Sequence, residues 1–501
     1  MSYSVDKLVL QAAFEREQKH PQKVFMTQPI KGEAIDYTWA ETIDQARRMA
    51  AHLRSLDLPE NSNIAMISKN CAHFIIAELA IWMAGHCTVA LYPTLNADTV
   101  DYILDHSESK LLFLGKLDDW ETMKAGVPEG MPIIALPLAP ENQYDKWDDI
   151  VARTEPMADN PVYPADQRAL ICYTSGSTGN PKGVVLSHKH MATGAKSVAS
   201  YLNNTQEDCL LAALPFSFDY GLSQLTTAFS VGASVVLMDY LLPRDVIRTI
   251  QKHNVTGLAA VPPLWNQLAQ LEWPEETAKS LRYLTNSGGA MPQATTNKLR
   301  ASLPNTQVFL MYGLTEAFRS TYLPPDQIDI RPTSMGKAIP NAQVLVVRPD
   351  GTECGPGEPG ELVHRGSLVA MGYWNDHKKT AERFKPSPTK PNGIPLDEVA
   401  VWSGDQVKKD EEGFLYFISR MDEMIKTSGY RVSPSEVEEA IYALPAVKEA
   451  AAIGLAHPTL GQAILLVITV TDDLTSQDIL KYCKKELPNF MVPQEVIFLD
   501  H

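Results

Sequence analysis

The chain has few of the residues from which disulfide frameworks and metal sites are built. Its 501 residues include six cysteines, and none of them forms a C-x-x-C pair or shows the spacing of a zinc site. This scatter favours reduced structural thiols in a cytoplasm, so we expect neither disulfides nor zinc. The histidines show no metal spacing either and are expected on the surface or in the core.

Long apolar segments and an excess of positive charge are also missing. No apolar run is long enough to span a membrane, and residues 1–6 lack the basic region and apolar core of a signal peptide. The formal net charge of −16 argues against a nucleic-acid partner and for a soluble protein. A nucleotide substrate would therefore need a local positive pocket.

The first part of the chain alternates between helical and strand patterns. Thr38 and Glu41 form a capping box before apolar residues at helical spacing. A strand-like run at 64–67, a helix-like run at 72–84 and a strand-like run at 88–92 follow, then a helical pattern near 100–105 and a strand at 111–114. This order predicts a parallel sheet. Residues 137–164 are rich in Pro, Asp and Asn and are expected to form a connecting loop.

The second part repeats this rhythm and then changes character. Strand-like runs at 233–238 and 257–263 continue the alternation, although no fixed-period repeat is present. From 342 to 366, short runs between Pro and Gly turns predict a small antiparallel or barrel-like subdomain. We expect an α/β protein whose large domain (1–420) has two α/β sheet subdomains and this β subdomain, followed by a small α+β domain (421–501), since the chain is too long for one core.

Both common nucleotide fingerprints, G-x-x-x-x-G-K-[ST] and G-x-G-x-x-G, are absent from the most distinctive polar stretch. Residues 173–183 read YTSGSTGNPKG, which combines glycines and hydroxyl side chains with Lys182. Backbone N–H groups of such a loop can turn inward onto a phosphate. A flexible Ser/Gly-rich surface loop is the alternative, but the flanking apolar runs 169–173 and 184–186 favour strands that hold the loop rigidly.

A second polar motif, Tyr312-Gly313-Leu314-Thr315-Glu316, follows a strand-like run at 307–310. We expect it at the carboxyl end of a strand, where open α/β sheets bind ligands. The ring of Tyr312 can stack on a base and Gly313 permits close approach. The hydroxyl of Thr315 and the carboxylate of Glu316 can hold Mg²⁺ on phosphate oxygens.

Together these motifs resemble the AMP-forming adenylating enzymes, the superfamily of acyl-CoA synthetases, peptide-synthetase adenylation domains and firefly luciferase. The 173–183 stretch is similar to their signature nearly letter for letter. Order and approximate spacing match across nearly the whole chain, through the segments 286–292, 402–405 and 419–432 with Pro434 and Glu436 behind them. Matches at 372–375 and at 454–458 are interpreted as architectural.

The resemblance implies a reaction in which ATP and Mg²⁺ convert a small-molecule carboxylic acid into an acyl-adenylate, with release of pyrophosphate. The thiol of coenzyme A, or the phosphopantetheine of an acyl carrier protein, then attacks the mixed anhydride. The protein's task is positioning and charge stabilisation. The lack of a Ser-His or Cys-His nucleophile pair agrees with this chemistry.

The resemblance also assigns roles to residues. The catalytic set is Thr174, Lys182, Thr315, Glu316, Arg420 and Lys426, and Thr315 and Glu316 are the metal ligands. ATP or AMP is bound by Thr174, Ser175, Gly176, Ser177, Thr178, Gly179, Lys182, Gly288, Gly289, Ala290, Tyr312, Gly313, Thr315, Asp405 and Arg420, with Asp405 accepting from the ribose hydroxyls. The acyl pocket comprises Phe218, Asp219, Gly221, Trp265 and Gly288. Asp422 marks the hinge, and Gly429 and Arg431 belong to the loop that enters the site for the thioester step.

The chain departs from the family at its end. Members usually carry a Pro-x-x-x-x-Gly-Lys segment whose lysine binds the reacting carboxylate and the α-phosphate, whereas this sequence stops at His501. This indicates either truncation or a naturally short member. The loss of one preorganised cation typically lowers the reaction rate roughly 100- to 1,000-fold. We therefore expect weak adenylation, with the thioester half-reaction largely retained.

The sequence gives two conflicting indications of the substrate. Phe218-Asp219 resembles the Phe-Asp of amino-acid adenylation domains, whose aspartate pairs with the substrate ammonium, although Asp219 could equally face a loop or water. Residues 68–71 and 91–95 look more like acyl-CoA synthetases. We predict an AMP-forming carboxylate–CoA ligase, with a carrier-loading enzyme and a noncatalytic nucleotide-binding relative as alternatives.

Overall fold

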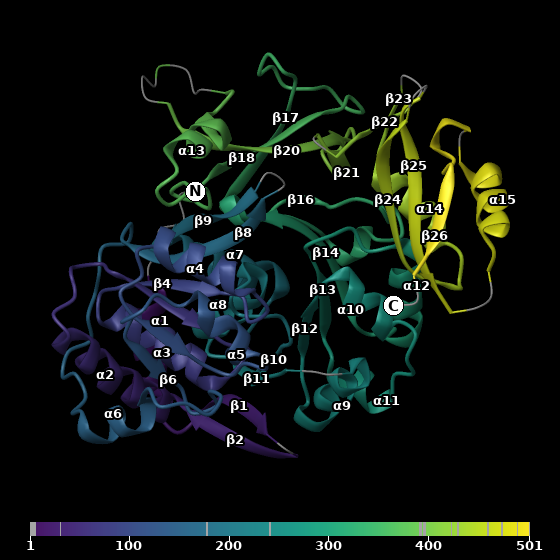
Figure 1. Ribbon diagram of the computed structural model, residues 1–501. Coiled ribbons are helices and arrows are strands. Elements are labelled where there is room, and N and C mark those ends of the chain that lie inside the picture. Colours follow the sequence, from purple (N-terminus) through teal and green to yellow (C-terminus); the bar gives the residue numbers. More distant parts are fainter. Residues whose placement is uncertain are drawn as a thin grey trace.

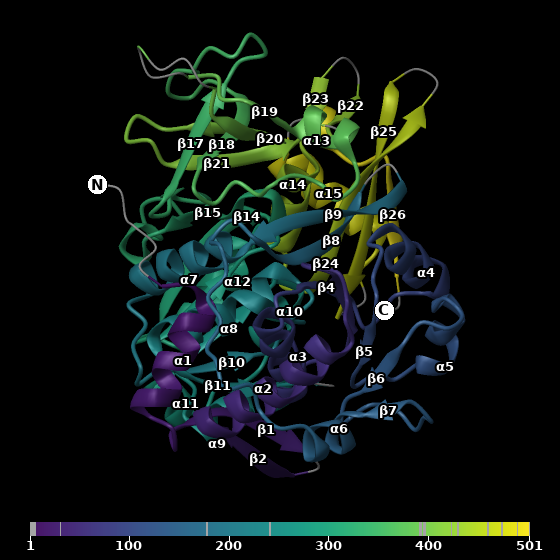
Figure 2. The ribbon, with the colours of Figure 1, turned by 90° about the vertical axis from the view of Figure 1, so that its left-hand side faces the viewer.

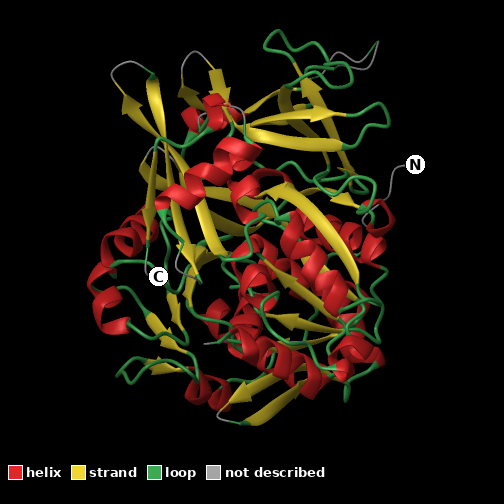
Figure 3. Ribbon diagram, turned by 90° about the vertical axis from the view of Figure 1, so that its right-hand side faces the viewer, coloured by secondary structure: helices red, strands yellow, loops and turns green. Residues whose placement is uncertain are grey.

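The computed structural model describes residues 7–30, 32–176, 179–239, 242–389, 393, 397–421, 423–427, 430–457, 460–471, 474–487 and 489–499. Two α/β halves lie side by side, a green antiparallel sheet lies above them, and a yellow C-terminal domain lies beside the teal half (Figure 1). Helices surround the central strands (Figure 3). The predicted α/β class, with a large domain and a small C-terminal domain, is confirmed.

The first half is built on a sheet with the strand order β7-β6-β5-β3-β4-β8-β9. Its strands are β3 (Asn63–Ile67), β4 (Cys87–Leu91), β5 (Leu112–Leu114), β6 (Ile133–Ala135), β7 (Asp145–Lys146), β8 (Arg168–Gly176) and β9 (Gly179–Ser187). Its helices are α1 (Val9–Lys19), α2 (Trp39–Ser55), α3 (Ala72–Met83), α4 (Ala97–His106), α5 (Trp120–Met123), η1 (Lys124–Gly126) and α6 (Trp147–Arg153). Strands β3 and β4 are buried along their whole length, as inner strands of a parallel sheet must be.

The second half is built on a sheet with the order β16-β15-β14-β13-β12-β10-β11-β1-β2. Its strands are β1 (Val24–Ile30), β2 (Glu33–Thr38), β10 (Cys209–Ala212), β11 (Ser234–Leu237), β12 (Gly257–Ala260), β13 (Tyr283–Asn286), β14 (Gln307–Leu314), β15 (Phe318–Leu323) and β16 (Lys337–Ala338). Its helices are α7 (His188–Leu202), α8 (Asp219–Val231), α9 (Pro243–His253), α10 (Pro262–Leu268), α11 (Glu275–Ser280), α12 (Gln293–Ser302), η2 (Thr315–Ala317) and η3 (Pro325–Gln327).

The third sheet is antiparallel, as the sequence predicts. It contains β17 (Ala342–Val347), β18 (Gly360–Gly366), β19 (Phe384–Pro386), β20 (Val399–Lys409) and β21 (Leu415–Arg420), with α13 (His377–Arg383) before β19. It lies over the ends of β14 and β15, so its strands can form one wall of a site there (Figure 2).

The C-terminal segment has a hydrophobic core of its own, which extends from Ile425 to Val492. It contains β22 (Ile425–Thr427), β23 (Tyr430–Val432), α14 (Pro434–Tyr442), β24 (Val447–His457), β25 (Gly461–Val470), α15 (Ser476–Glu486), η4 (Asn489–Met491) and β26 (Glu495–Phe498). Among the described residues, no helix is both long and apolar enough to cross a membrane.

Local sequence explains the helices that were predicted well. The side chain of Thr38 accepts from the backbone N–H of Glu41, and the Glu41 carboxylate accepts from the backbone N–H of Thr38, so α2 begins with the predicted capping box. Helix α3 is buried on all sides, because its residues are apolar around the whole circumference.

The prediction of a connecting loop over 137–164 is wrong in part, since this segment contains β7 and α6. Helix α6 forms because Trp147 is fully buried and packs edge-on against His73, while its ring N–H donates to Gln45. A tertiary contact of this kind outweighs a composition typical of loops.

We predict that Trp147→Ala lowers the free energy of unfolding by about 3–5 kcal/mol, because it leaves a cavity beneath α6. Urea unfolding followed by circular dichroism would measure the change. Val162→Ala, at a residue that is 66% exposed in the same connection, is the matched control and should change stability little. Equal effects of the two substitutions would contradict a packing role for Trp147.

Candidate active site

A cavity of about 970 Å³ opens between the second α/β half, the antiparallel sheet and the small domain. Its lining includes seven of the residues predicted to bind nucleotide: Gly288, Gly289, Ala290, Tyr312, Gly313, Asp405 and Arg420. Helix α14 contributes Ser435, Glu436 and Glu439 from the opposite side. The structure thus brings together residues that lie more than a hundred positions apart in the chain.

One end of the cavity is organised by Asp405. The phenol of Tyr312 donates to the Asp405 carboxylate, and the guanidinium Nε of Arg420 lies 3.3 Å from its other oxygen. Arg420 is the cross-strand neighbour of Asp405 in the β20–β21 pair. Burial, together with the adjacent Asp405 carboxylate, raises the pKa of Tyr312 well above its ordinary value, so the phenol stays a donor.

A buried histidine lies behind Tyr312. The rings of His364 and Tyr312 stack with their centroids 5.9 Å apart and an angle of 17° between the planes. Burial, with the guanidinium of Arg383 nearby, lowers the pKa of His364 to about 3. This imidazole is therefore neutral at physiological pH and packs against the ring of Tyr312 from behind.

The predicted phosphate stretch forms the end of the β8–β9 hairpin. Thr174 is the cross-strand neighbour of Lys182, and Gly176 pairs with Gly179. The hairpin is held from outside by the segment 371–374, because the backbone N–H of Trp374 donates to the Gly183 carbonyl at 2.7 Å. The loop therefore rests on rigid strands, in agreement with the prediction from its apolar flanks.

Tyr373 connects this hairpin to the second motif. The Nζ atom of Lys182 lies 5.5 Å from the centroid of the Tyr373 ring, and the Tyr373 hydroxyl donates to Glu316 Oε1 at 2.5 Å. Glu316 is 8% exposed and follows the half-buried Thr315 on the turn η2. Lys182 and Glu316 are therefore both in contact with Tyr373.

Several predicted residues lie outside the described part of the chain. These are Ser177, Thr178, Asp422 and Gly429, together with the side chains of Ser175, Lys426 and Arg431. The backbones of Lys426 and Arg431 pair with each other in the β22–β23 hairpin. None of the described residues of that hairpin lines the cavity.

The acyl-pocket prediction is only partly reflected in the geometry. Phe218 caps α8, and a Cβ on Gly288 would lie 3.8 Å from its ring. Asp219 begins α8, and burial raises the pKa of its carboxyl group, although the charge of Arg319 opposes the shift.

Two members of that set have packing roles. A Cβ on Gly221 would lie 2.1 Å from the Pro215 carbonyl oxygen, so this glycine allows α8 to approach the preceding loop. Trp265 is fully buried in a core cluster, and its ring N–H donates to the Ala260 carbonyl at 3.0 Å. Neither residue lines the cavity described above.

Sequence reasoning missed three residues near the site. A Cβ on Gly404 would lie 2.9 Å from Nη1 of Arg383, which places this guanidinium beside the Gly404-Asp405 pair. His364 and Arg319 were not identified either. Arg319 follows the 312–316 motif by only three positions, and this closeness in sequence could have indicated it. Nothing in the sequence around Arg383 or His364 indicates a place near the site.

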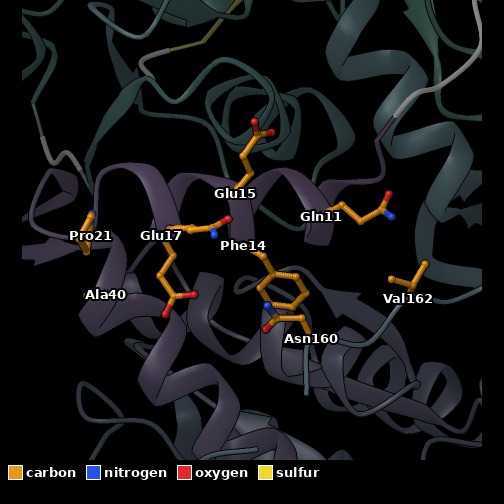
Figure 4. Close-up of a pocket in the computed structure, with 9 residues that line it drawn as sticks. Gln11, Phe14, Glu15, Glu17, Pro21, Ala40, Asn160 and Val162 are labelled. Carbon is orange, nitrogen blue, oxygen red and sulfur yellow. The ribbon is translucent and has the colours of Figure 1, made fainter. Parts of the chain in front are cut away.

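A second hollow, of about 660 Å³, lies beside α1 and is lined by Gln11, Phe14, Glu15, Glu17 and Asn160 among others (Figure 4). Its charged groups already have partners. Glu17 pairs with Arg47, and hydrogen bonds from Lys19 and Lys7 lower the pKa of Glu15 to about 2. None of the predicted site residues lies there.

Comparison with known proteins gives a consistent result. Residues 13–374 match the AMP-binding enzyme family, and residues 436–501 match the AMP-binding enzyme C-terminal domain. A linear gramicidin synthase of Brevibacillus parabrevis is 27% identical over 99% of this chain, which spans only 9% of that protein. The 4-coumarate–CoA ligase 3 of Oryza sativa subsp. japonica is 27% identical over 93% of this chain and 84% of its own.

Among solved structures, o-succinylbenzoate CoA synthetase from Bacillus subtilis, in complex with the acyl-adenylate intermediate OSB-AMP, is similar with a TM-score of 0.83. Its sequence identity is 26%, and the match covers 98% of this chain and 94% of that one. The likeness therefore includes both the large and the small domain.

The lowered pKa of His364 predicts a specific dependence of stability on pH. Its folded pKa is about 3, whereas an unfolded histidine has a pKa of about 6.5. The stabilisation is present above pH 6.5 and is lost as the pH falls, because only the unfolded state takes up the proton. Between pH 7 and pH 5 the wild type should lose about 2 kcal/mol more than His364→Phe.

Urea unfolding at both pH values would measure this difference. His377→Phe, at the exposed start of α13, is the control and should behave like the wild type. An equal loss in the wild type and in His364→Phe would show that His364 is not held neutral.

Proposed function

The chain belongs to the AMP-binding enzyme family, and we propose that it is an AMP-forming carboxylate–CoA ligase. In the first step a carboxylate oxygen attacks the α-phosphorus of ATP, the bond to pyrophosphate breaks and acyl-AMP forms. In the second step the sulfur of coenzyme A attacks the acyl carbon and AMP leaves. The likeness to the rice ligase and to the adenylate-bound synthetase supports this reaction class.

The observation that carries the proposal is the arrangement of Tyr312, Asp405 and Arg420 in one cavity. A carboxylate fixed by Tyr312 and Arg420 can accept hydrogen bonds from two neighbouring ribose hydroxyls. The ring of Tyr312 and the backbone of 288–290 supply a flat, closely approachable surface for the adenine. Arg420 and the nearby Arg383 supply positive charge for the α-phosphate.

The other end of the site suits the leaving pyrophosphate. Lys182 and Thr174 face each other across the hairpin, so a cation and a hydroxyl come from adjacent strands. Thr315 and Glu316 fit Mg²⁺, because they offer hard oxygen ligands and Glu316 is oriented by Tyr373. When bound, Mg²⁺ would neutralise phosphate charge, and Lys182 would add to this stabilisation.

We propose that the second step requires a rotation of the small domain. The backbone N–H of Gln293 donates to Glu439 Oε1 at 3.0 Å, a small polar contact between the domains that rotation can break. The proposed domains are 1–420 and 421–501, with the hinge at Asp422. Gly429, Lys426 and Arg431 would then enter the site from the β22–β23 segment.

A carrier-protein thiol is the second candidate acceptor. Asp219 at the start of α8 and the likeness to the linear gramicidin synthase favour it. We also propose a cytoplasmic location, since all six cysteines are free thiols in the structure.

The test is acid-dependent conversion of ATP to AMP and pyrophosphate, with thioester formation on coenzyme A or on a phosphopantetheine carrier. The proposal predicts AMP, pyrophosphate and thioester in equal amounts. ADP and phosphate as products would contradict it, and AMP binding without turnover of any acid would favour the noncatalytic alternative.

Asp405→Ala should weaken AMP binding roughly 10- to 100-fold, because the charged acceptor for the ribose hydroxyls is lost. Calorimetric titration of AMP would measure the dissociation constants. The matched control is Asp350→Ala, at an aspartate of a turn between β17 and β18. Unchanged AMP affinity in folded Asp405→Ala would refute the ribose assignment.

A further inference from the structure

Arg319 is a buried cation on β15, directly behind the nucleotide motif. It is 3% exposed and is the cross-strand neighbour of Gly313 in β14. Figure 2 shows β14 and β15 together, with α7 and α8 packed beneath them. The side chain points to the α8 face, where its Nη2 atom lies 3.2 Å from Ser223 Oγ and its guanidinium carbon 4.4 Å from the centroid of the Tyr220 ring.

The guanidinium of Arg319 is positively charged, but the groups that it contacts through hydrogen bonds are neutral. It offers five N–H donors, and its neighbours are neutral groups such as the Ser223 hydroxyl and the thioether of Met311, whose Sδ lies 3.9 Å from Nη1. No described carboxylate forms an ion pair with Arg319. Burial of a cation without an ion-paired carboxylate is costly, so an anionic group of a bound ligand would stabilise this arginine.

Two other arginines with little exposure form ion pairs with carboxylates. Arg47 is 16% exposed and forms an ion pair with Glu17, and Arg331 is 11% exposed and forms ion pairs with Asp410 and Glu412. Arg319 is more deeply buried than either. Arg16 and Arg168 are less buried and also lack a carboxylate partner among the described residues, but each donates to a backbone carbonyl oxygen.

The surroundings of Arg319 belong to the acyl side of the proposed site. Asp219, Tyr220 and Ser223 all come from the first turns of α8, next to the predicted acyl contact Phe218. The charge of Arg319 lowers the pKa of Asp219 against the larger effect of burial, so the two side chains share one environment, yet they form no ion pair.

The backbone fixes Arg319 close to the reacting centre. Phe318 has a φ of 55°, a conformation that costs energy for a bulky residue. Glu316 precedes this turn and Arg319 follows it. A Cβ on Gly313 would lie 2.9 Å from the Arg319 Cα, so the arginine strand packs directly against the nucleotide strand. An anion held by Arg319 would therefore lie next to the strand that carries Tyr312 and Gly313.

We propose that Arg319 binds a second carboxylate in the acyl part of the substrate, so that the enzyme activates short dicarboxylic acids in preference to monocarboxylic acids. The proposal rests on the proposed function and names its substrate class. The guanidinium can form two parallel hydrogen bonds with such a carboxylate. Asp219, at the start of α8, would contact a further polar group, such as an ammonium, on that acid.

The test compares matched acids in acid-dependent ATP–pyrophosphate exchange. Malonic, succinic and glutaric acids are paired with their monomethyl esters, which have a similar length but only one free carboxylate. The wild type should show a kcat/KM at least about 10-fold higher for the diacid of the best pair. Arg319→Met should remove this preference while it retains exchange with the ester, and Arg319→Lys should keep part of it.

Arg300→Met, which removes a surface ion pair with Asp329, is the control and should keep the preference. If the wild type uses esters as well as diacids, the inference about Arg319 is wrong while the proposed function stands. If neither kind supports exchange but another carboxylic acid does, the inference is wrong and the proposed function stands; if no carboxylic acid supports exchange, both are wrong. Should Arg319→Met fail to fold, the wild-type comparison and Arg319→Lys still decide.

Discussion

The hydrogen bond from Tyr312 to Asp405 joins the two sheets between which the site is formed. Tyr312 belongs to β14 of the mostly parallel sheet, and Asp405 belongs to β20 of the antiparallel sheet. Arg420, on the neighbouring strand β21, holds the same carboxylate from the other side. Because the cavity lies where these strands meet, its shape and its main acceptor depend on this contact. A carboxylate bound in this way is oriented before a ligand arrives, which lowers the entropic cost of binding.

The electrostatics of the site differ from those of the whole chain. The net charge of −16 would repel a nucleotide, yet Lys408 and Arg420 line the cavity, Arg383 lies beside Gly404, and Lys182 lies on the β8–β9 hairpin. His364 stays neutral behind Tyr312, so it supports that ring without adding charge. Arg319 adds a separate positive centre on the acyl side. The cavity lining also includes Asp405, Glu436 and Glu439, so the groups that would offset the phosphate charge are single basic side chains from separate segments and not an overall positive wall.

Local patterns in the sequence predicted much of the fold and the polar centre of the site. The capping box at Thr38, the apolar flanks of 173–183 and the motif at 312–316 each depend on neighbouring residues, and each predicted structure is present. Features that depend on distant contacts were missed. Helix α6 exists because Trp147 is buried, and nothing in its own Asp-rich segment indicates that burial.

The same distinction applies within the site. Gly221 and Trp265 have residue types suited to a pocket, but backbone approach and core packing determine their positions. Arg319 and Arg383 look like ordinary surface arginines in the sequence. Only the three-dimensional arrangement shows that Arg319 is buried without an ion pair to any described carboxylate and that Arg383 lies beside Gly404.

The most direct measurement of the central claim uses a carboxylic acid labelled with ¹⁸O in its carboxylate, together with ATP, Mg²⁺ and coenzyme A. If the carboxylate attacks the α-phosphorus, mass spectrometry should find one ¹⁸O atom in the AMP that is released when the thioester forms. Label in inorganic phosphate, or thioester formation without label in AMP, would contradict activation through an acyl-adenylate.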